Sequence, residues 1–246
     1  MAKALHAVFI TGASSGVGAA LAEEYAAPGT VLGLVARRKE RLAAVAQRCR
    51  TLGASVQTYR LDVTDGSALQ RAAQAFLKRT QRIDVVIANA GVGGWKHPLT
   101  SDIDAMVGMV DVNVNGVIHT LAPFFAQMVK QEYGHLVAVS SIASFRGLPG
   151  GVYAATKAAV RYLMDGWRID LASHGVTVTT VFPGFVESEM TNRKRWYPFL
   201  LPPDRAAKLI RYGIAHRYRN VILPWQWWLL VPIMKLVPDW FFRQRF

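Results

Sequence analysis

Short apolar runs alternate with longer amphipathic stretches along most of the chain. The runs are rich in β-branched residues and have the length of strands that are buried on both faces of a sheet. They predict strands at 7–10, 31–36, 55–61, 83–88, 136–139, 177–182 and 220–223.

The stretches between these runs repeat their apolar residues with the period of a helix that has one apolar face. They predict a helix that follows the first strand and ends near residue 27, and helices at 39–52, 67–80, 106–130 and 152–173. Strands that alternate with helices of this length form a parallel sheet through right-handed crossovers. We expect an α/β fold, a Rossmann-type doubly wound parallel sheet of about seven strands with helices on both faces. Ligands of such sheets bind beyond the carboxyl ends of the strands.

Composition narrows the class of protein. Residues 1–246 contain 52% hydrophobic and 18% charged residues, without a repeat or linker, and predict a single domain. Cys49 is the only cysteine, which excludes an intrachain disulfide and a cysteine metal cluster, and no metal site is expected. The first residues lack the apolar core of a signal peptide, and no apolar run reaches the roughly 20 residues of a membrane span. A cytoplasmic location is therefore expected.

The net charge of +13 raises the question of a nucleic-acid partner. Anionic cofactors, acidic membranes and solubility explain a basic balance equally well. The chain shows no helix-turn-helix, no zinc finger and no basic region interleaved with stacking aromatic residues. We therefore expect no nucleic-acid partner.

A glycine-rich loop, TGASSGVG at 11–18, follows the first predicted strand. Glycine permits a tight turn and close approach of the backbone, and the next helix directs free N–H groups at a pyrophosphate. A dinucleotide is therefore expected at this loop. The residues expected to hold it are Gly12, Ser14, Ser15, Gly16, Val17 and Gly18.

The end of the second strand indicates which dinucleotide is bound. An acidic residue there would bind the 2′-hydroxyl of the adenosine ribose, whereas an arginine suits a 2′-phosphate. The strand ends in Arg37 and Arg38, and the first carboxylate is Glu40. These residues favour NADP(H), with Arg37 as the main contact; the alternative is a solvated, basic start of a helix.

Tyr153 and Lys157 lie in the sequence YAATK, four residues apart, so that a helix places them on one face. Taken alone, this pair also suits an ordinary buried helix. Here the chain resembles the short-chain dehydrogenase/reductase family, over about residues 5–190. The motifs that carry the resemblance are TGASSGVG at 11–18, LDVTD at 61–65, NAG at 89–91, VNVNG at 112–116, SS at 140–141, YAATK at 153–157 and PGFVES at 183–188.

The resemblance implies further cofactor contacts. Asp62 and the Val63 backbone would bind the adenine, and Pro183, Gly184, Val186 and Ser188 would line the nicotinamide end, with Val186 holding the carboxamide. The adenosine ribose would rest on Asn89, Ala90 and Gly91. Otherwise these residues are ordinary turn formers.

The resemblance also implies a proton relay. Lys157 would lower the pKa of Tyr153 from its usual value near 10, so that Tyr153 exchanges a proton with the substrate oxygen, and would hold the nicotinamide ribose. Asn113 would hold a water that connects Lys157 to solvent. The substrate oxygen would accept a hydrogen bond from a serine. Spacing to the tyrosine selects Ser140 and the pattern of the paired serines selects Ser141; we favour Ser141, because insertions and deletions gather in loops.

The resemblance fades after about residue 190. Residues 185–246 are expected to form a variable substrate lid and a C-terminal hydrophobic, aromatic extension, and residues 221–246 hold four of the seven tryptophans. This segment could close the pocket, form an oligomer interface, lie on a membrane surface or bind another partner. A segment that closes an apolar pocket and a segment that lies on a membrane surface would both suggest a lipophilic substrate, such as a fatty, steroid, retinoid or terpenoid carbonyl. A homodimer or homotetramer is usual for the family.

Together these observations predict an NADP(H)-dependent oxidoreductase that interconverts a carbonyl and a secondary alcohol on a small molecule. The alternative is a non-catalytic NADP(H)-binding sensor or scaffold on the same fold. The set of Tyr153, Lys157, Asn113 and a serine argues against a sensor, which needs no proton relay.

Overall fold

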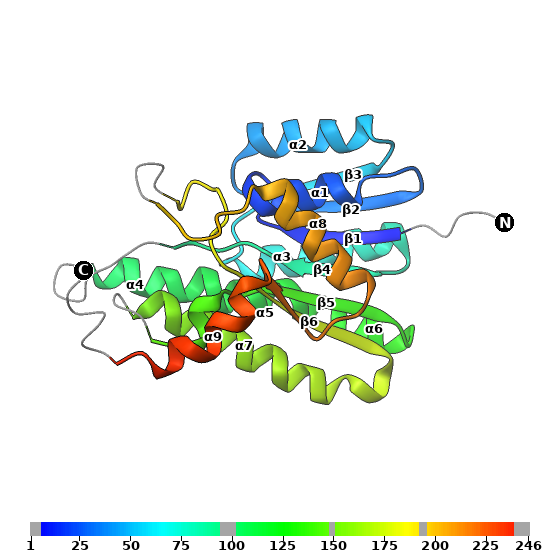
Figure 1. The fold of residues 1–246 in the computed structure, drawn as a ribbon. Helices are drawn as coiled ribbons and strands as arrows, with labels where there is room; N and C mark the ends of the chain where they lie inside the picture. The colour runs from blue at the N-terminus through cyan, green and yellow to red at the C-terminus, as the bar shows by residue number, and fades with distance from the viewer. Residues whose placement is uncertain (1–5, 94–101, 148–150, 192–195, 239–246) are drawn as a thin grey trace.

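The computed structural model describes residues 6–93, 102–147, 151–191 and 196–238. Within these residues, seven parallel strands form one sheet in the order β3-β2-β1-β4-β5-β6-β7 (Figure 1). The strands are β1 (His6–Thr11), β2 (Thr30–Ala36), β3 (Ser55–Arg60), β4 (Val85–Ala88), β5 (Gly134–Val139), β6 (Val176–Pro183) and β7 (Asn220–Leu223). The predicted doubly wound α/β fold is confirmed, and each predicted strand is present with its ends shifted by at most two residues.

Helices cover both faces of the sheet (Figure 1). One face packs against α1 (Gly16–Tyr25), α2 (Lys39–Thr51) and α8 (Pro203–Ala215). The other face packs against α3 (Gly66–Thr80), α5 (Gly116–Leu121), α6 (Phe125–Lys130) and α7 (Val152–Asp170). Successive residues of a strand point to opposite faces, and in β1 Val8 joins the first core while Phe9 joins the second. Both faces of the inner strands are thus buried, which explains their continuous apolar runs, whereas the edge strand β3 is partly exposed.

The predicted helix over 106–130 is not one regular α-helix. The helical path runs through α4 (Ile103–Val110), a π turn (Asp111–Asn115), α5, a 3₁₀ turn (Ala122–Phe124) and α6. Pro123 has no N–H to donate, which accounts for the tighter turn at that point. The π turn contains Asn113, whose side chain is completely buried beside the site described below.

The last quarter of the chain contains two helices that hydrophobic periodicity did not predict, α8 and α9 (Gln226–Leu236). Two buried residues of α9, Trp227 and Val231, pack with Ile142 and Phe182 in a third apolar cluster at the carboxyl ends of β5 and β6. No helix in the described part of the chain is long and apolar enough to cross a membrane. Residues 192–195 and 239–246 of the predicted lid and extension lie outside the described residues, as do 148–150 before Tyr153.

Candidate active site

In the glycine loop between β1 and α1, Gly12 and Gly16 have a positive φ, whereas Gly18 leaves room for close packing of the backbone. Gly12 has a φ of +69°, and a Cβ there would lie 2.8 Å from the Cα of Ala90. At Gly18 a Cβ would lie 2.3 Å from the carbonyl oxygen of Gly12, so this glycine lets α1 pack on the loop. At Gly16, with a φ of +53°, the only atom within 4 Å would be the Cβ of Ser188, at 3.9 Å. The first turn of α1 is therefore open to an approaching group, as binding of a pyrophosphate requires.

A cavity of about 1070 Å³ lies beside this loop, at the carboxyl ends of the strands. Most of the predicted site residues, from seven separate segments of the chain, line it. They are Gly12, Ser14, Ser15, Gly16, Val17, Arg37, Arg38, Asp62, Val63, Asn89, Ala90, Gly91, Ser141, Tyr153, Lys157, Pro183, Gly184, Val186 and Ser188. Gly18 and Asn113 are the two predicted residues that do not line the cavity, and both lie directly behind its wall.

Asn89 joins the end of β4 to the glycine loop. Its Nδ2 donates to the carbonyl oxygens of Thr11, at 3.1 Å, and Gly12, at 3.4 Å. Two residues on, a Cβ at Gly91 would lie 3.4 Å from Nζ of Lys157 and 3.2 Å from Oδ1 of Asn113. The absence of a side chain at Gly91 therefore leaves room for the Nζ of Lys157 at the cavity wall.

Arg37 and Asp62 form an ion pair on the cavity wall, with 3.1 Å between Nη1 and Oδ2. Asp62 also accepts hydrogen bonds from the backbone N–H and the hydroxyl of Thr64, both at 3.0 Å. Partial burial raises the pKa of Asp62, but the bonds from Thr64 and the charge of Arg37 outweigh burial, and the pKa is lowered overall. Asp62 is thus an ionised acceptor on this wall.

Arg38 lies against the glycine loop. Its guanidinium donates to the hydroxyls of Ser14, at 3.3 Å, and Ser15, at 2.5 Å. Nη1 of Arg38 also lies 2.6 Å from the carboxylate of Glu189, which pairs in addition with Arg41. The two arginines at the end of β2 therefore have different surroundings, although both line the cavity.

The side chain of Asn113 is held by the loop after β4. Its Oδ1 accepts from the N–H of Val92 at 2.8 Å, and its Nδ2 donates to the Val92 carbonyl at 2.9 Å and to the Thr156 hydroxyl at 3.1 Å. Asn113 thus joins the loop after β4 to the helix that carries Tyr153 and Lys157. Its expected water contact stays a prediction.

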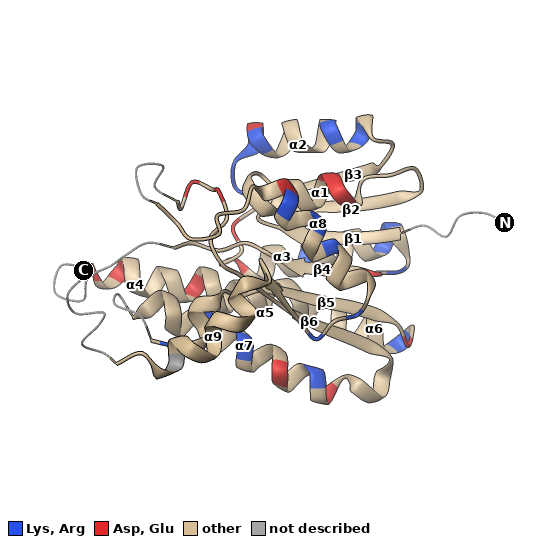
Figure 2. Cartoon of the chain, viewed as in Figure 1, with Lys and Arg blue, Asp and Glu red and all other residues tan. Residues whose placement is uncertain are grey.

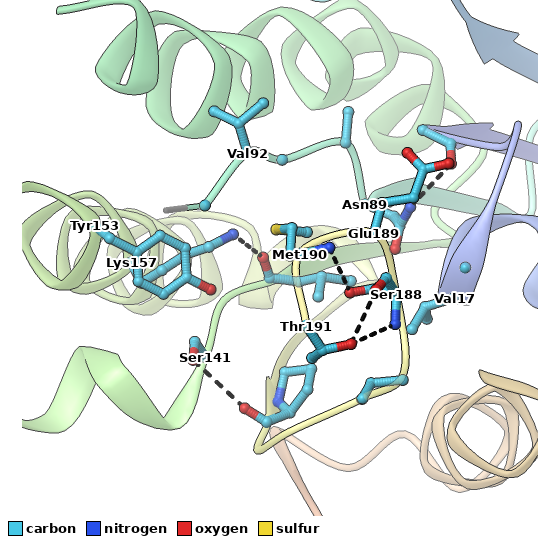
Figure 3. Close-up of a pocket in the computed structure, with 18 of the residues that line it drawn as sticks. Val17, Asn89, Val92, Ser141, Tyr153, Lys157, Ser188, Glu189, Met190 and Thr191 are labelled. Atoms are coloured by element: carbon cyan, nitrogen blue, oxygen red, sulfur yellow. Dashed lines mark hydrogen bonds between the residues drawn. The ribbon is translucent and has the colours of Figure 1, made fainter. Parts of the chain in front are cut away.

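Tyr153 and Lys157 project from the first two turns of α7 into the cavity, on the side that also holds Ser141 (Figure 3). Nζ of Lys157 donates to the Val139 carbonyl at 3.0 Å and lies 5.8 Å from the centroid of the Tyr153 ring. Burial lowers the pKa of Lys157 to about 8, which leaves it mostly charged at neutral pH. Burial raises the pKa of Tyr153, and a hydrogen bond with Ser141 lowers it by a smaller amount. In this geometry burial outweighs the expected lowering of the Tyr153 pKa, which ends above its usual value.

The two candidate serines have different partners. The Ser140 hydroxyl donates to the carbonyl of Lys157 at 2.8 Å and is 3% exposed, so it fastens α7 to the end of β5. The Ser141 hydroxyl interacts with Tyr153 and accepts from the Ala143 N–H at 3.1 Å, and its donor contact within the described residues is a long one, 3.5 Å, to the Pro183 carbonyl. Ser141 can therefore turn its proton to another acceptor at little cost, whereas Ser140 cannot.

The end of the cavity beyond Tyr153 is lined by apolar and aromatic side chains. Phe185 of the PGFVES motif lies at this end, together with residues outside the family motifs: Ile142, Met190, Trp196, Tyr197, Trp227 and Met234. They come from segments that adjoin β5 and β6 and from α9, which lies close to this end of the sheet (Figure 1). The tryptophan content of the last quarter was the only signal in the sequence for them, and it could not tell pocket residues from surface residues.

Comparison with known proteins agrees with this geometry. The family model described as short chain dehydrogenase matches residues 6–197. An uncharacterized oxidoreductase of Myxococcus xanthus is 38% identical over 232 residues, which cover 94% of this chain and 92% of that protein.

Two solved structures are similar in fold and differ in their ligand. An alcohol dehydrogenase from the archaeon Thermococcus sibiricus, complexed with 5-hydroxy-NADP, aligns with a TM-score of 0.80 at 30% identity, over 89% of this chain and 95% of that one. A short chain dehydrogenase/reductase from Burkholderia phymatum, in complex with NAD, aligns with a TM-score of 0.84 at 26% identity, over 95% and 94%.

Proposed function

Because the chain belongs to the short-chain dehydrogenase/reductase family, and is therefore an NAD(P)-dependent oxidoreductase, we propose that it interconverts a carbonyl and a secondary alcohol with NADP(H). The observation that carries this proposal is the position of Tyr153, Ser141 and Lys157 on one wall of a cavity that also contains the open glycine loop. The loop, with Gly16 facing open space and Gly12 in a left-handed conformation, fits the backbone approach of a dinucleotide.

The catalytic side chains have complementary parts in this reaction. The nicotinamide, when bound, supplies or accepts the hydride at the carbon of the substrate. Ser141 donates a hydrogen bond to the substrate oxygen and positions it, and Tyr153 exchanges a proton with the same oxygen. The raised pKa of Tyr153 keeps its hydroxyl protonated at neutral pH. In this geometry Tyr153 is suited to donate a proton to a carbonyl oxygen.

Lys157 has two further parts in the proposal. One of its three N–H bonds is used by the Val139 carbonyl, and the other two are available to the hydroxyls of the nicotinamide ribose. Its positive charge beside the buried tyrosine stabilises a phenolate when Tyr153 loses its proton. Asn113, which fixes the loop after β4 to α7, is proposed to place a water between Lys157 and solvent.

The preference for NADP(H) rests on the cations at the end of β2. Arg38 and Arg41 share one carboxylate beside the glycine loop, and Arg37 lies next to them on the cavity wall. No acidic residue directly follows β2, where it would repel a 2′-phosphate. We propose Arg38 as the first contact of the phosphate, because its guanidinium also bonds to the hydroxyls of the glycine loop, and Arg37, which pairs with Asp62, as the second.

The substrate is proposed to be lipophilic. The wall beyond Tyr153 offers Ile142, Phe185, Trp227 and Met234, which suit an apolar molecule with a single reacting oxygen. Lids of this kind usually close over their substrate, which accords with the expected role of residues 185–246. The protein is proposed to act as a homodimer or homotetramer, which light scattering after size-exclusion chromatography would measure.

The outer side of α9 bears on the predicted membrane association. Trp225, Trp228, Leu229 and Ile233 are each more than half exposed, on the side opposite Trp227. Such a surface suits a lipid interface as well as a second subunit, so membrane association stays a prediction. Co-sedimentation of the full chain with anionic and neutral vesicles, with Trp225→Ser/Trp228→Ser as the variant, would decide it.

An activity screen tests the proposed reaction. Lipophilic ketones and alcohols are offered with NADPH, NADH, NADP and NAD, and the change in nicotinamide absorbance is followed. We expect turnover of several ketones, faster with NADPH than with NADH. Tight NADPH binding without turnover of any compound would favour the alternative, a non-catalytic sensor or scaffold.

A further inference from the structure

The segment that follows β6 reaches across the cavity and ends in a stiff turn. At its base Val186 pairs with Leu201, and the N–H of Glu187 donates to the Leu201 carbonyl at 2.9 Å. The turn is closed by Ser188 and Thr191, since the Ser188 N–H donates to the Thr191 hydroxyl at 2.9 Å and that hydroxyl donates to the Ser188 carbonyl at 2.9 Å. Glu189 lies inside this turn (Figure 3).

The carboxylate of Glu189 is held by two arginines that are about 150 residues away in the sequence. Nη1 of Arg38 donates to both of its oxygens, at 2.6 and 2.9 Å, and Arg41 donates to Oε1. In Figure 2 the acidic segment after β6 lies beside the basic start of α2, in agreement with these ion pairs. The turn therefore presents one anion to a pair of guanidinium groups.

The surroundings of Glu189 have the chemistry of a phosphate site. Nη1 of Arg38 holds the carboxylate while its Nε and Nη2 donate to the hydroxyls of Ser14 and Ser15, and Arg41 pairs with the same carboxylate, so two guanidinium groups lie beside the glycine loop. Guanidinium groups bind phosphate in the same forked manner as carboxylate. In this fold the 2′-phosphate of NADP(H) binds near the end of the second strand, where Arg38 lies. The carboxylate of Glu189 thus engages guanidinium groups that could otherwise bind an anionic ligand.

We propose that Glu189 is a specificity-determining residue, whose carboxylate competes with the 2′-phosphate for Arg38 and Arg41. The side chains of Glu189 and Arg41 are both more than half exposed, so solvent weakens their pairing and a phosphate with more charge can displace the carboxylate. Glu189 then lowers the affinity for NADP(H) and leaves the affinity for NAD(H) unchanged, because NAD(H) has no group to place there. This inference rests on the proposed use of NADP(H).

Binding of adenosine nucleotides tests the inference without turnover. The dissociation constants of 2′,5′-ADP and 5′-ADP are measured by calorimetry at one fixed ionic strength, for the full-length wild type, Glu189→Gln and the control Glu187→Gln. Glu187 is an exposed acid on the same segment, so its variant has the same change in net charge. We expect Glu189→Gln to bind 2′,5′-ADP about fivefold more tightly, which corresponds to the upper range for an exposed ion pair, and 5′-ADP as the wild type does. Glu187→Gln should match the wild type for both.

Three results would overturn the inference. Weaker binding of 2′,5′-ADP by Glu189→Gln would mean that Glu189 holds the ligand in place, and an equal gain in Glu187→Gln would mean a general charge effect. Unchanged binding in Glu189→Gln would show that there is no competition. If the proposed preference for NADP(H) is wrong, a different result is expected: Arg38→Ala would leave the affinity for 2′,5′-ADP unchanged. A loss in Arg38→Ala with no gain in Glu189→Gln would refute only the role of Glu189.

Discussion

Lys157 lies over the ring of Tyr153, with its Nζ 5.8 Å from the ring centroid and bonded to the Val139 carbonyl at 3.0 Å. The four-residue spacing in the sequence predicted that these side chains would share one helix face, and they do. Their electrostatic relationship differs from the expectation, because burial raises the pKa of Tyr153 and lowers that of Lys157. In the folded protein Tyr153 is therefore protonated, and burial makes the charged form of the neighbouring Lys157 less favourable.

Removing the Tyr153 hydroxyl tests its part in proton exchange. Tyr153→Phe keeps the ring that packs in the cavity wall and loses only the group that exchanges a proton. We expect turnover to fall by a factor of about 10² to 10⁴, the usual contribution of general acid–base catalysis, with the NADPH dissociation constant changed less than threefold, that is by less than about 0.7 kcal/mol. Steady-state rates and a fluorescence titration measure the two quantities, and a variant that retains full turnover would remove Tyr153 from the mechanism.

Burial of Lys157 predicts a pH-dependent cost in stability. Its pKa is about 8 in the folded protein and 10.5 in the unfolded chain, so the unfolded chain binds more protons between pH 8 and pH 10.5. The free energy of unfolding due to this group therefore rises with pH across that window, and the cost is largest below pH 8. Lys157→Met removes the charge and should stabilise the protein at pH 7, by up to about 3 kcal/mol, while abolishing turnover.

Urea unfolding of the wild type and Lys157→Met at pH 7 and pH 10 measures this effect. The advantage of the variant should shrink at pH 10, where the wild-type lysine is neutral in the folded protein. A variant that is less stable than the wild type by the same amount at both pH values would show that the packing of Lys157 outweighs its charge.

Alanine substitutions of Ser140 and Ser141, measured in parallel, show which of the two serines is catalytic. Ser141→Ala removes the donor beside Tyr153 and the acceptor of the Ala143 N–H, and should lower turnover by about 10²-fold at a cost of about 1 kcal/mol of stability. Ser140→Ala breaks the 2.8 Å bond to the Lys157 carbonyl and should cost about 1 kcal/mol of stability while keeping most of the turnover. Rates and urea midpoints of both variants are the measurement, and the opposite pattern would make Ser140 the catalytic serine.

The arginines at the end of β2 are distinguished in the same way. Arg38→Ala should weaken NADPH binding about tenfold or more and leave NADH binding nearly unchanged, because only NADPH carries the 2′-phosphate. Arg37→Asp should shift the preference towards NAD(H), since a carboxylate there repels the phosphate and suits the 2′-hydroxyl. An unchanged ratio of NADPH to NADH affinity in Arg37→Asp would take Arg37 out of this role.

Much of the fold and the cofactor end of the cavity could be predicted because local patterns determine them. Continuous apolar runs such as 31–36 are buried on both faces wherever they lie in a parallel sheet, and all seven strands were found in this way. Gly12 and Gly16 adopt left-handed conformations that their position between a strand and a helix implied. Such features depend on neighbours in the chain.

The features that could not be predicted depend on contacts between distant segments. Glu189 meets Arg38 and Arg41 across about 150 residues, and no local pattern reveals that pairing. The π turn that buries Asn113 interrupts a helix whose periodicity looked regular, and α9 is apolar on nearly every side, so that periodicity could not reveal it as a helix. The pKa of Tyr153 is raised by burial, and the spacing between Tyr153 and Lys157 in the sequence gives no information on burial.

The most direct test of the central claim follows the hydride itself. NADPH that carries deuterium at the transferable position of its nicotinamide is incubated with a lipophilic ketone found in the screen, and the alcohol is analysed by mass spectrometry, with Tyr153→Phe as the control. The proposed function predicts one deuterium at the carbinol carbon with the wild type and almost none with the variant. Tight binding of NADPH with no deuterated alcohol from any ketone would contradict it.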